Sequence, residues 1–140
     1  MTELAGVAHM VIRVEDRTRS KQWYQEVLGF EQRTGPRFSS FVHPSTPFAL
    51  LLREVDHSID ASSTTSQRLD HIALHVPTLD ALEEWRATLA ERNVDVEIER
   101  QPGVGASITL YDPDGLEVEL FTPEAGTPLD VNVGTTTAAT

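Results

Sequence analysis

In the first part of the chain the spacing of apolar residues changes from every second residue, as in a strand, to the spacing of a helix. Apolar and polar residues alternate over residues 7–14, the pattern of a strand with one buried face. Apolar positions then recur at helical spacing over residues 20–28, and Gly29 follows where helices commonly end. Three further strands are predicted at residues 30–34, 38–43 and 48–55. Residues 1–55 therefore read as one βαβββ module.

The same order of elements returns in the second part of the chain. Residues 56–68 are polar and rich in Ser and Thr, a composition typical of a linker. A strand is predicted at residues 69–76, and Thr78 caps the helix that follows. Three more strands are predicted at residues 94–100, 106–111 and 116–121. The second module therefore covers residues 69–121, and residues 122–140 are expected to form a flexible tail.

The two halves constitute an internal repeat. His9 and His71 occupy matching positions in the first strand of each half, and the closing hairpins align without a gap, so Leu51 is the counterpart of Glu119. Neither module is large enough to bury the face of its own sheet. We therefore expect an α+β fold, in which two tandem βαβββ modules pair into one curved, eight-stranded mixed sheet around a central cavity and form a single domain.

Strand periodicity places two histidines and one carboxylate on a common face. His9 and His71 point away from the side that the helix of each module covers, and Glu119 does so on the last strand. Two imidazoles and a carboxylate leave coordination positions open; they suit Fe(II), and Mn(II) or another divalent ion tolerates them. A lone strand histidine is more often a hydrogen-bonded pocket residue, but the repeat favours one divalent metal ion bound by His9, His71 and Glu119.

Other residues are expected to line the same cavity. His75 and Arg13 are repeat counterparts, and each can be either a hydrogen-bonding wall residue or a catalytic acid or anion clamp. The residues predicted to contact a substrate are Phe41, Leu51, Arg53, Thr109, Tyr111 and Phe121.

Composition narrows the classes of partner. Lys and Arg number 11 and Asp and Glu 22, a net charge of −11, which disfavours nucleic acid and anionic membrane partners and suits a cation. Cysteine is absent, so His, Asp and Glu are the strong metal ligands that remain. The N-terminal residues show no basic start followed by a long apolar run. We expect a cytoplasmic protein that binds a small-molecule substrate.

Four segments match a known family pattern. They are Ala8-His9, Trp23-Tyr-Gln-Glu-Val-Leu-Gly-Phe30, Asp70-His-Ile-Ala-Leu-His-Val76 and Tyr111-Asp-Pro-Asp-Gly-Leu-Glu-Val-Glu-Leu-Phe121. With these segments the chain resembles the vicinal oxygen chelate superfamily, which includes glyoxalase I, methylmalonyl-CoA epimerase, extradiol ring-cleaving dioxygenases, fosfomycin-resistance thiol transferases and bleomycin-resistance proteins. The resemblance implies metal ligands at His9, His71 and Glu119. Glyoxalase I and the epimerase have a fourth ligand where this chain has Leu51, which disfavours both activities.

Three functions follow from the resemblance. The first is a metal-dependent enzyme, most like an extradiol dioxygenase, that chelates a substrate through two adjacent oxygens; Thr109 stands where that branch has a Tyr, and residues 102–107 lack its His, so His75 or His43 would have to substitute. The second is a metal-free protein of the bleomycin-resistance type that sequesters a small molecule. The third is a thiol transferase of the fosfomycin-resistance type or a glyoxalase-like lyase. The resemblance also implies a homodimer, with modules paired within or between chains.

Overall fold

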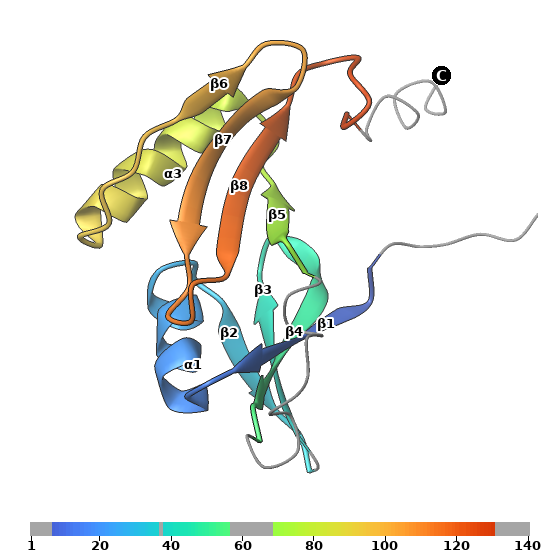
Figure 1. Ribbon diagram of the computed structural model, residues 1–140, viewed down its shortest axis with the longest axis vertical. Coiled ribbons are helices and arrows are strands. Elements are labelled where there is room, and N and C mark those ends of the chain that lie inside the picture. Colours follow the sequence, from blue (N-terminus) through green and yellow to red (C-terminus); the bar gives the residue numbers. More distant parts are fainter. Residues whose placement is uncertain (1–6, 37, 57–68, 131–140) are drawn as a thin grey trace, which may run out of the picture. The chain divides into compact units, whose positions relative to one another are not determined.

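The computed structural model describes residues 7–36, 38–56 and 69–130 (Figure 1). Most of the predicted linker and the last ten residues of the predicted tail lie outside this range. The described chain divides into two compact units. The first comprises the residues up to Leu69 together with Asp112–Gly115, and the second comprises Asp70–Tyr111 and the residues from Leu116 onward.

The first unit is a four-stranded mixed sheet with one helix. Its elements are β1 (His9–Val14), α1 (Arg17–Glu26), β2 (Glu31–Thr34), β3 (Ser39–His43) and β4 (Thr46–Glu54). The strand order is β1-β4-β3-β2, with β1 parallel to β4 and the other pairs antiparallel. The helix begins three residues earlier than predicted, because the Asp16 side chain accepts a hydrogen bond from the Arg19 backbone N–H and caps it.

The second unit repeats this arrangement. Its elements are β5 (His71–His75), α3 (Leu79–Glu91), β6 (Glu99–Gln101), β7 (Gly105–Tyr111) and β8 (Glu117–Pro123). The order β5-β8-β7-β6 is equivalent to that of the first sheet, with β5 parallel to β8. Thr78 caps α3, as predicted, by accepting from the Ala81 N–H, and α3 packs against β7 and β8 (Figure 1).

The strand predicted at residues 94–100 is shorter than expected. Asn93 adopts a positive φ of 63°, and the Val94 N–H bonds back to the Leu89 carbonyl oxygen at 2.8 Å. These residues therefore terminate the helix rather than begin a strand. Only Glu99–Gln101 pairs with β7.

The predicted α+β fold class is confirmed by these two mixed sheets, each with one parallel outer pair of strands. The predicted burial of alternate strand residues is confirmed as well. Ile12 and Val14 on β1, Ile72 on β5, and Val118 and Leu120 on β8 are buried. The module boundaries, and the joining of the two sheets into one, stay predictions.

The turn Asp112–Gly115 belongs to the first unit although it connects two strands of the second sheet. The buried Tyr24 hydroxyl donates to Asp112 Oδ2 at 3.0 Å. Asp114 accepts from the Arg19 guanidinium at 2.7 Å and from the Glu15 backbone N–H at 3.0 Å. Burial, reinforced by the neighbouring Asp112 carboxylate, raises the pKa of Tyr24. Helix α1 thus holds this turn through one buried and one exposed hydrogen bond, and Glu15, just before the helix, adds another exposed one.

Among the helices in the described ranges, none combines the length and the apolar character that crossing a membrane would require.

Candidate metal centre

Polar side chains lie in rows across one face of the second sheet. Residues paired in register on neighbouring strands point to the same side. Across β5, β8 and β7 the rows are His71, Glu117 and Tyr111; Ala73, Glu119 and Thr109; and His75, Phe121 and Ser107. All six residues of the second module that the sequence nominated for the site therefore share this face.

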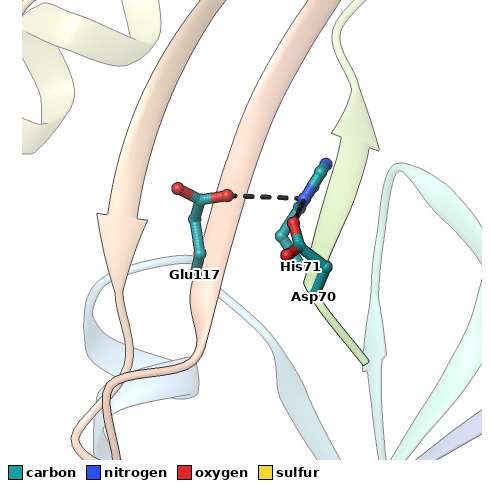
Figure 2. A group of neighbouring side chains, drawn as sticks. All are labelled: Asp70, His71 and Glu117. Carbon is teal, nitrogen blue, oxygen red and sulfur yellow. Dashed lines mark hydrogen bonds and ion pairs between the residues drawn. The ribbon is translucent and has the colours of Figure 1, made fainter. Parts of the chain in front are cut away.

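The imidazole of His71 lies among three carboxylates. Its Nδ1 atom is 2.6 Å from Asp70 Oδ2 and 3.4 Å from Glu117 Oε2 (Figure 2). Its other nitrogen, Nε2, is 3.8 Å from Glu119 Oε2. The structure thus brings together two of the three predicted ligands, His71 and Glu119, and adds Asp70 and Glu117 around the same ring.

The pKa values of His71 and Glu119 are both raised, for different reasons. The hydrogen bond to Asp70 is the largest cause of a raised His71 pKa; Glu119 and Glu117 add to it, and burial opposes it. Burial is the largest cause of a raised Glu119 pKa, to which Glu117 and Glu99 contribute and which His71 opposes. Negative charge is therefore concentrated around one imidazole, an environment that attracts a cation.

The donor set fits a divalent metal ion. It offers imidazole nitrogen and carboxylate oxygen without thiolate, which suits Fe(II), Mn(II) and similar ions. Asp70, His71 and Glu117 also present one donor atom each within 4.8 Å of one another. The side chains of His71, Glu117 and Glu119 are 39 %, 32 % and 20 % exposed, so an ion can reach them from solvent.

On the equivalent face of the first sheet, the positions that match Glu117 and Glu119 are apolar. His9 pairs in register with Ala49, Val11 with Leu51 and Arg13 with Arg53. Ala49 and Leu51 are thus the counterparts of Glu117 and Glu119, and Ala8 is the counterpart of Asp70. His9 and Arg13 are exposed on this face. The backbone pairing and the histidine that begins the first strand recur in both units, but Asp70, Glu117 and Glu119 have no acidic counterpart at the matching positions of the first unit.

A cleft of about 710 Å³ opens on the first unit beside this face. Val11, Phe38, Leu51 and Arg53 are among the residues that line it. Two residues nominated as substrate contacts, Leu51 and Arg53, therefore lie at a cleft large enough for a small molecule.

Phe41 does not share that face, and its expected role as a substrate contact is corrected. It pairs with Leu50 rather than Leu51, and its side chain is fully buried. In the second unit the equivalent residue, Thr109, pairs with Glu119. The pairing at Phe41 thus differs by one residue from the pairing at Thr109, and a one-residue difference in register places a side chain on the opposite face.

Two further histidines were considered for acid–base chemistry. His75 is exposed and points to the same side of β5 as His71. His43 instead holds a turn: its Nε2 is 2.9 Å from the Leu28 carbonyl oxygen, and its Nδ1 is 2.6 Å from the Ser45 hydroxyl. His43 therefore has a structural setting, whereas His75 is placed on the acidic face.

The sequence reasoning did not nominate Asp70 or Glu117. Strand period already put Glu117 on the same face as Glu119, so this residue could have been found. Asp70 precedes the strand, and its contact with His71 depends on side-chain rotamers that periodicity does not describe. The Asp-His dipeptide at the start of the strand was the available signal.

Comparisons with known proteins agree with this fold. The model of the Glyoxalase/Bleomycin resistance protein/Dioxygenase superfamily matches residues 6–120. The chain therefore belongs to this superfamily. A curated relative, biphenyl-2,3-diol 1,2-dioxygenase 3 of Rhodococcus globerulus, is 25% identical over 139 residues, which cover 91% of this chain and 68% of the relative.

Solved structures with the same fold have differing functions. Lactoylglutathione lyase from Agrobacterium tumefaciens matches with a TM-score of 0.67 at 18% identity, over 86% of this chain and 96% of the lyase. An antibiotic-binding protein from Streptomyces sp. CB03234 matches with a TM-score of 0.62 at 23% identity, over 89% of this chain and 100% of that protein. At these identities the likeness establishes the fold and leaves the activity open.

Proposed function

We propose that this protein is a metal-dependent enzyme, most like a ring-cleaving extradiol dioxygenase, that binds a small substrate through two adjacent oxygens. The observation that carries the proposal is the approach of His71 Nε2 to Glu119 Oε2, at 3.8 Å, on an acidic sheet face. Ligand atoms on one ion with bonds of about 2.1 Å lie roughly 3.0–3.4 Å apart, so small rotations of the two side chains suffice to share a cation.

His9 is the third ligand in this proposal. Its support is the repeat. His9 is the first residue of β1, as His71 is the first residue of β5. His9 pairs with Ala49 on β4, and His71 pairs with the matching residue, Glu117, on β8. Fe(II) is the favoured ion, and Mn(II) or another divalent ion is compatible with the same donors. When bound, the ion supplies Lewis-acid stabilisation of negative charge on the substrate oxygens.

Residues around the ligands bind and orient the substrate. The Tyr111 ring, 62% exposed, lies in the row of His71 and Glu117, and Thr109 lies in the row of Glu119. Phe121 offers an apolar contact one row further along. Leu51 and Arg53 add an apolar and a cationic contact from the cleft of the first unit.

Proton transfer is assigned to His75. Its imidazole lies four residues beyond His71 on the same face of β5, and imidazole is the side chain that most often exchanges a proton with a substrate hydroxyl. Arg13, opposite Arg53 in register, is assigned to an anionic group of the substrate.

The dioxygenase branch is favoured over the lyase branch by two observations. Leu51 cannot supply the fourth ligand that the resemblance associates with glyoxalase I. The curated relative that matches most of this chain is a biphenyl-2,3-diol dioxygenase, a protein whose name indicates an aromatic diol with adjacent oxygens. An aromatic diol would present both the oxygens and the apolar ring that Phe121 and Leu51 can contact.

Metal content and turnover test this proposal. Protein purified without chelator is reconstituted with Fe(II) under anaerobic conditions, then assayed for O₂ uptake with catechol and with 2,3-dihydroxybiphenyl. We expect about one equivalent of bound metal and O₂ uptake with at least one diol, both lost in His71→Ala and Glu119→Ala. Less than about a tenth of an equivalent after reconstitution would contradict metal dependence.

The second candidate function is sequestration of a cationic aromatic molecule without metal. Exposed Tyr111 beside Glu117, and the carboxylates of the same face, favour such a ligand through stacking and charge. A thermal-shift screen of metal-free protein with cationic glycopeptides and aromatic amines separates the two. Stabilisation by these ligands in protein that binds no metal supports sequestration, and the absence of any shift excludes it for that panel.

We also propose a homodimer, on the grounds that paired modules recur between as well as within chains of the superfamily that this chain resembles. Light scattering coupled to size exclusion should give about twice the monomer mass of 15.5 kDa.

A further inference from the structure

Asp70 is not among the predicted metal ligands, yet it contacts one of them, His71. Its carboxylate is 92% exposed, yet its Oδ2 lies 2.6 Å from His71 Nδ1. An ionised carboxylate only accepts hydrogen bonds, so this contact requires a proton on Nδ1. An imidazole with its proton on Nδ1 presents an unshared electron pair on Nε2, the nitrogen that faces Glu119.

We propose that Asp70 is a positioning residue that fixes the Nδ1–H form of His71 and so directs Nε2 toward the metal. The inference rests on the proposed metal site and adds to it a residue that acts through His71 rather than on the ion. Ligating histidines commonly donate their other N–H to a carboxylate, which orients the ring and raises its basicity as a ligand.

The distances distinguish this role from direct coordination by Asp70. Two ligand atoms on one ion with bonds of about 2.1 Å lie about 3.0 Å apart at a right angle and about 3.4 Å apart at a tetrahedral angle. The Asp70–His71 separation of 2.6 Å is too short for either arrangement but is normal for a charge-assisted hydrogen bond. The His71–Glu119 separation of 3.8 Å instead exceeds both values, leaving room for an ion between the atoms.

Glu117 strengthens the same orientation. Its Oε2 is 3.4 Å from Nδ1, so Asp70 and Glu117 both face the protonated side of the ring (Figure 2). Glu119 faces the other nitrogen, Nε2. The other neutral form of the ring, with its proton on Nε2, would point the unshared pair of Nδ1 at Asp70 and Glu117, which is electrostatically unfavourable.

The repeat provides an internal comparison. Ala8 and Ala49 stand at the positions of Asp70 and Glu117, so His9 lacks the carboxylates that orient His71. Of the two repeat-equivalent histidines, His71 is thus the pre-oriented ligand.

Nitrogen NMR of the metal-free protein tests the orientation by itself. Above the pKa of His71, long-range ¹H–¹⁵N spectra of wild type should show a protonated Nδ1 and an unprotonated Nε2 for His71, with assignment from His71→Ala. In Asp70→Ala the ring should shift toward the Nε2–H form, and Asp70→Asn, whose amide oxygen still accepts a hydrogen bond, should retain much of the wild-type pattern. His75, on the same strand and face, should not change. A wild-type His71 with its proton on Nε2 would overturn the proposal.

Metal titration supplies the second readout. Mn(II) affinity should fall about 10–100-fold in Asp70→Ala, with partial recovery in Asp70→Asn, and should be unchanged in the control Asp95→Ala, an exposed acidic residue outside the sheets. Glu119→Gln should cost more affinity than Glu117→Gln; the reverse order would place the ion on Nδ1 and refute the role of Asp70. If wild type binds Mn(II) and Asp70→Ala binds it equally well, the inference fails while the metal site stands. If wild type binds no metal, the proposed function fails, whatever tautomer the spectra show.

Discussion

Single side chains distinguish the two units at equivalent positions of the same backbone. At equivalent positions the first unit has Ala8, Ala49 and Leu51, and the second has Asp70, Glu117 and Glu119. These three differences place carboxylates around His71 that the matching positions around His9 lack. At this scale the charge around each histidine depends on which residues occupy the matching positions, and the strand pairing determines which of them are neighbours.

Tyr24 is the residue whose removal should be most visible in stability. Its hydroxyl is the buried donor to Asp112, a residue only 4% exposed. Tyr24→Phe should lower the free energy of unfolding by about 1–3 kcal/mol, measured by urea denaturation, because a buried carboxylate loses a donor. Tyr111→Phe, at an exposed ring, is the matched control and should cost little. Equal stabilities of the two variants would contradict the role of the buried hydrogen bond.

The raised pKa of Tyr24 predicts how stability changes in alkali. In the unfolded chain a tyrosine loses its proton near pH 10, whereas in the folded protein burial and Asp112 keep Tyr24 protonated to higher pH. The contribution is therefore fully present below about pH 10 and is lost as the pH rises above it, by up to about 1.4 kcal/mol per pH unit. The difference in unfolding free energy between wild type and Tyr24→Phe should shrink over this range. A difference that stays constant from pH 9 to 11 would contradict this linkage.

Ser20 gives the opposite kind of prediction. Its hydroxyl is fully buried in α1 and has no hydrogen-bond partner among the described residues. Ser20→Ala removes an unsatisfied polar group and improves helix propensity, so the free energy of unfolding should stay constant or rise by up to about 1 kcal/mol. A loss of stability in urea denaturation would show that the hydroxyl has a partner after all.

At the scale of elements, the hairpins decide which side chains reach the site. The β7–β8 pair keeps one register from Gly105 to Tyr111, so Thr109 and Tyr111 share the face of Glu119 and Glu117. In the β3–β4 pair Phe41 lies opposite the buried Leu50 rather than Leu51, and it is buried with it. Apolar periodicity predicted both hairpins, but it could not predict a one-residue shift, because that shift depends on how the turn closes rather than on the alternation of residues.

Much of the element pattern could be predicted from the sequence, because burial of one strand face selects apolar residues at alternate positions. Alternation identified β1, β5 and β8 and their buried faces, since burial is what selects apolar residues there. Apolar and polar residues also alternate over residues 94–98, yet these residues form no strand. The Val94 N–H bonds back to the Leu89 carbonyl oxygen at the end of α3, and pairing with β7 begins only at Glu99. The Asp70–His71 contact depends on side-chain orientation and is outside what periodicity describes.

Gly105 offers a test of close packing within the second sheet. A Cβ built there would overlap the Thr122 carbonyl oxygen and approach Pro123 Cα to 2.9 Å, whereas a Cβ on Gly103 would meet nothing within 4 Å. Both glycines have positive φ. Gly105→Ala should therefore cost about 2 kcal/mol or more of unfolding free energy beyond the cost of Gly103→Ala. Similar losses in thermal or urea denaturation would show that the steric contact is relieved by small movements.

At the scale of the whole molecule, the two units repeat one backbone arrangement, and the residues at matching positions differ where the candidate site lies. Membership of the superfamily and the repeated βαβββ order explain the architecture. The net charge of −11 fits a protein that attracts cations, and the carboxylates around His71 give that attraction a location. The proposal that His9 joins them comes from the repeat and from the family resemblance.

A bound ion should also stabilise the folded protein. An ion that binds only the native state, present at about 100 times its Kd, adds roughly 2.7 kcal/mol to the free energy of unfolding. Thermal denaturation of wild type should therefore shift upward on addition of Mn(II), and His71→Ala should show no shift. Equal shifts in both proteins would indicate binding elsewhere.

Calorimetric titration with Mn(II) tests the central claim, that His71 and Glu119 hold a divalent cation, most directly. Wild type and the control Glu97→Gln, an exposed acidic residue distant in sequence from both ligands, should each bind about one ion with the same affinity. Glu119→Gln and His71→Ala should each bind at least about tenfold more weakly. Wild-type affinity retained in both of these variants would contradict the claim.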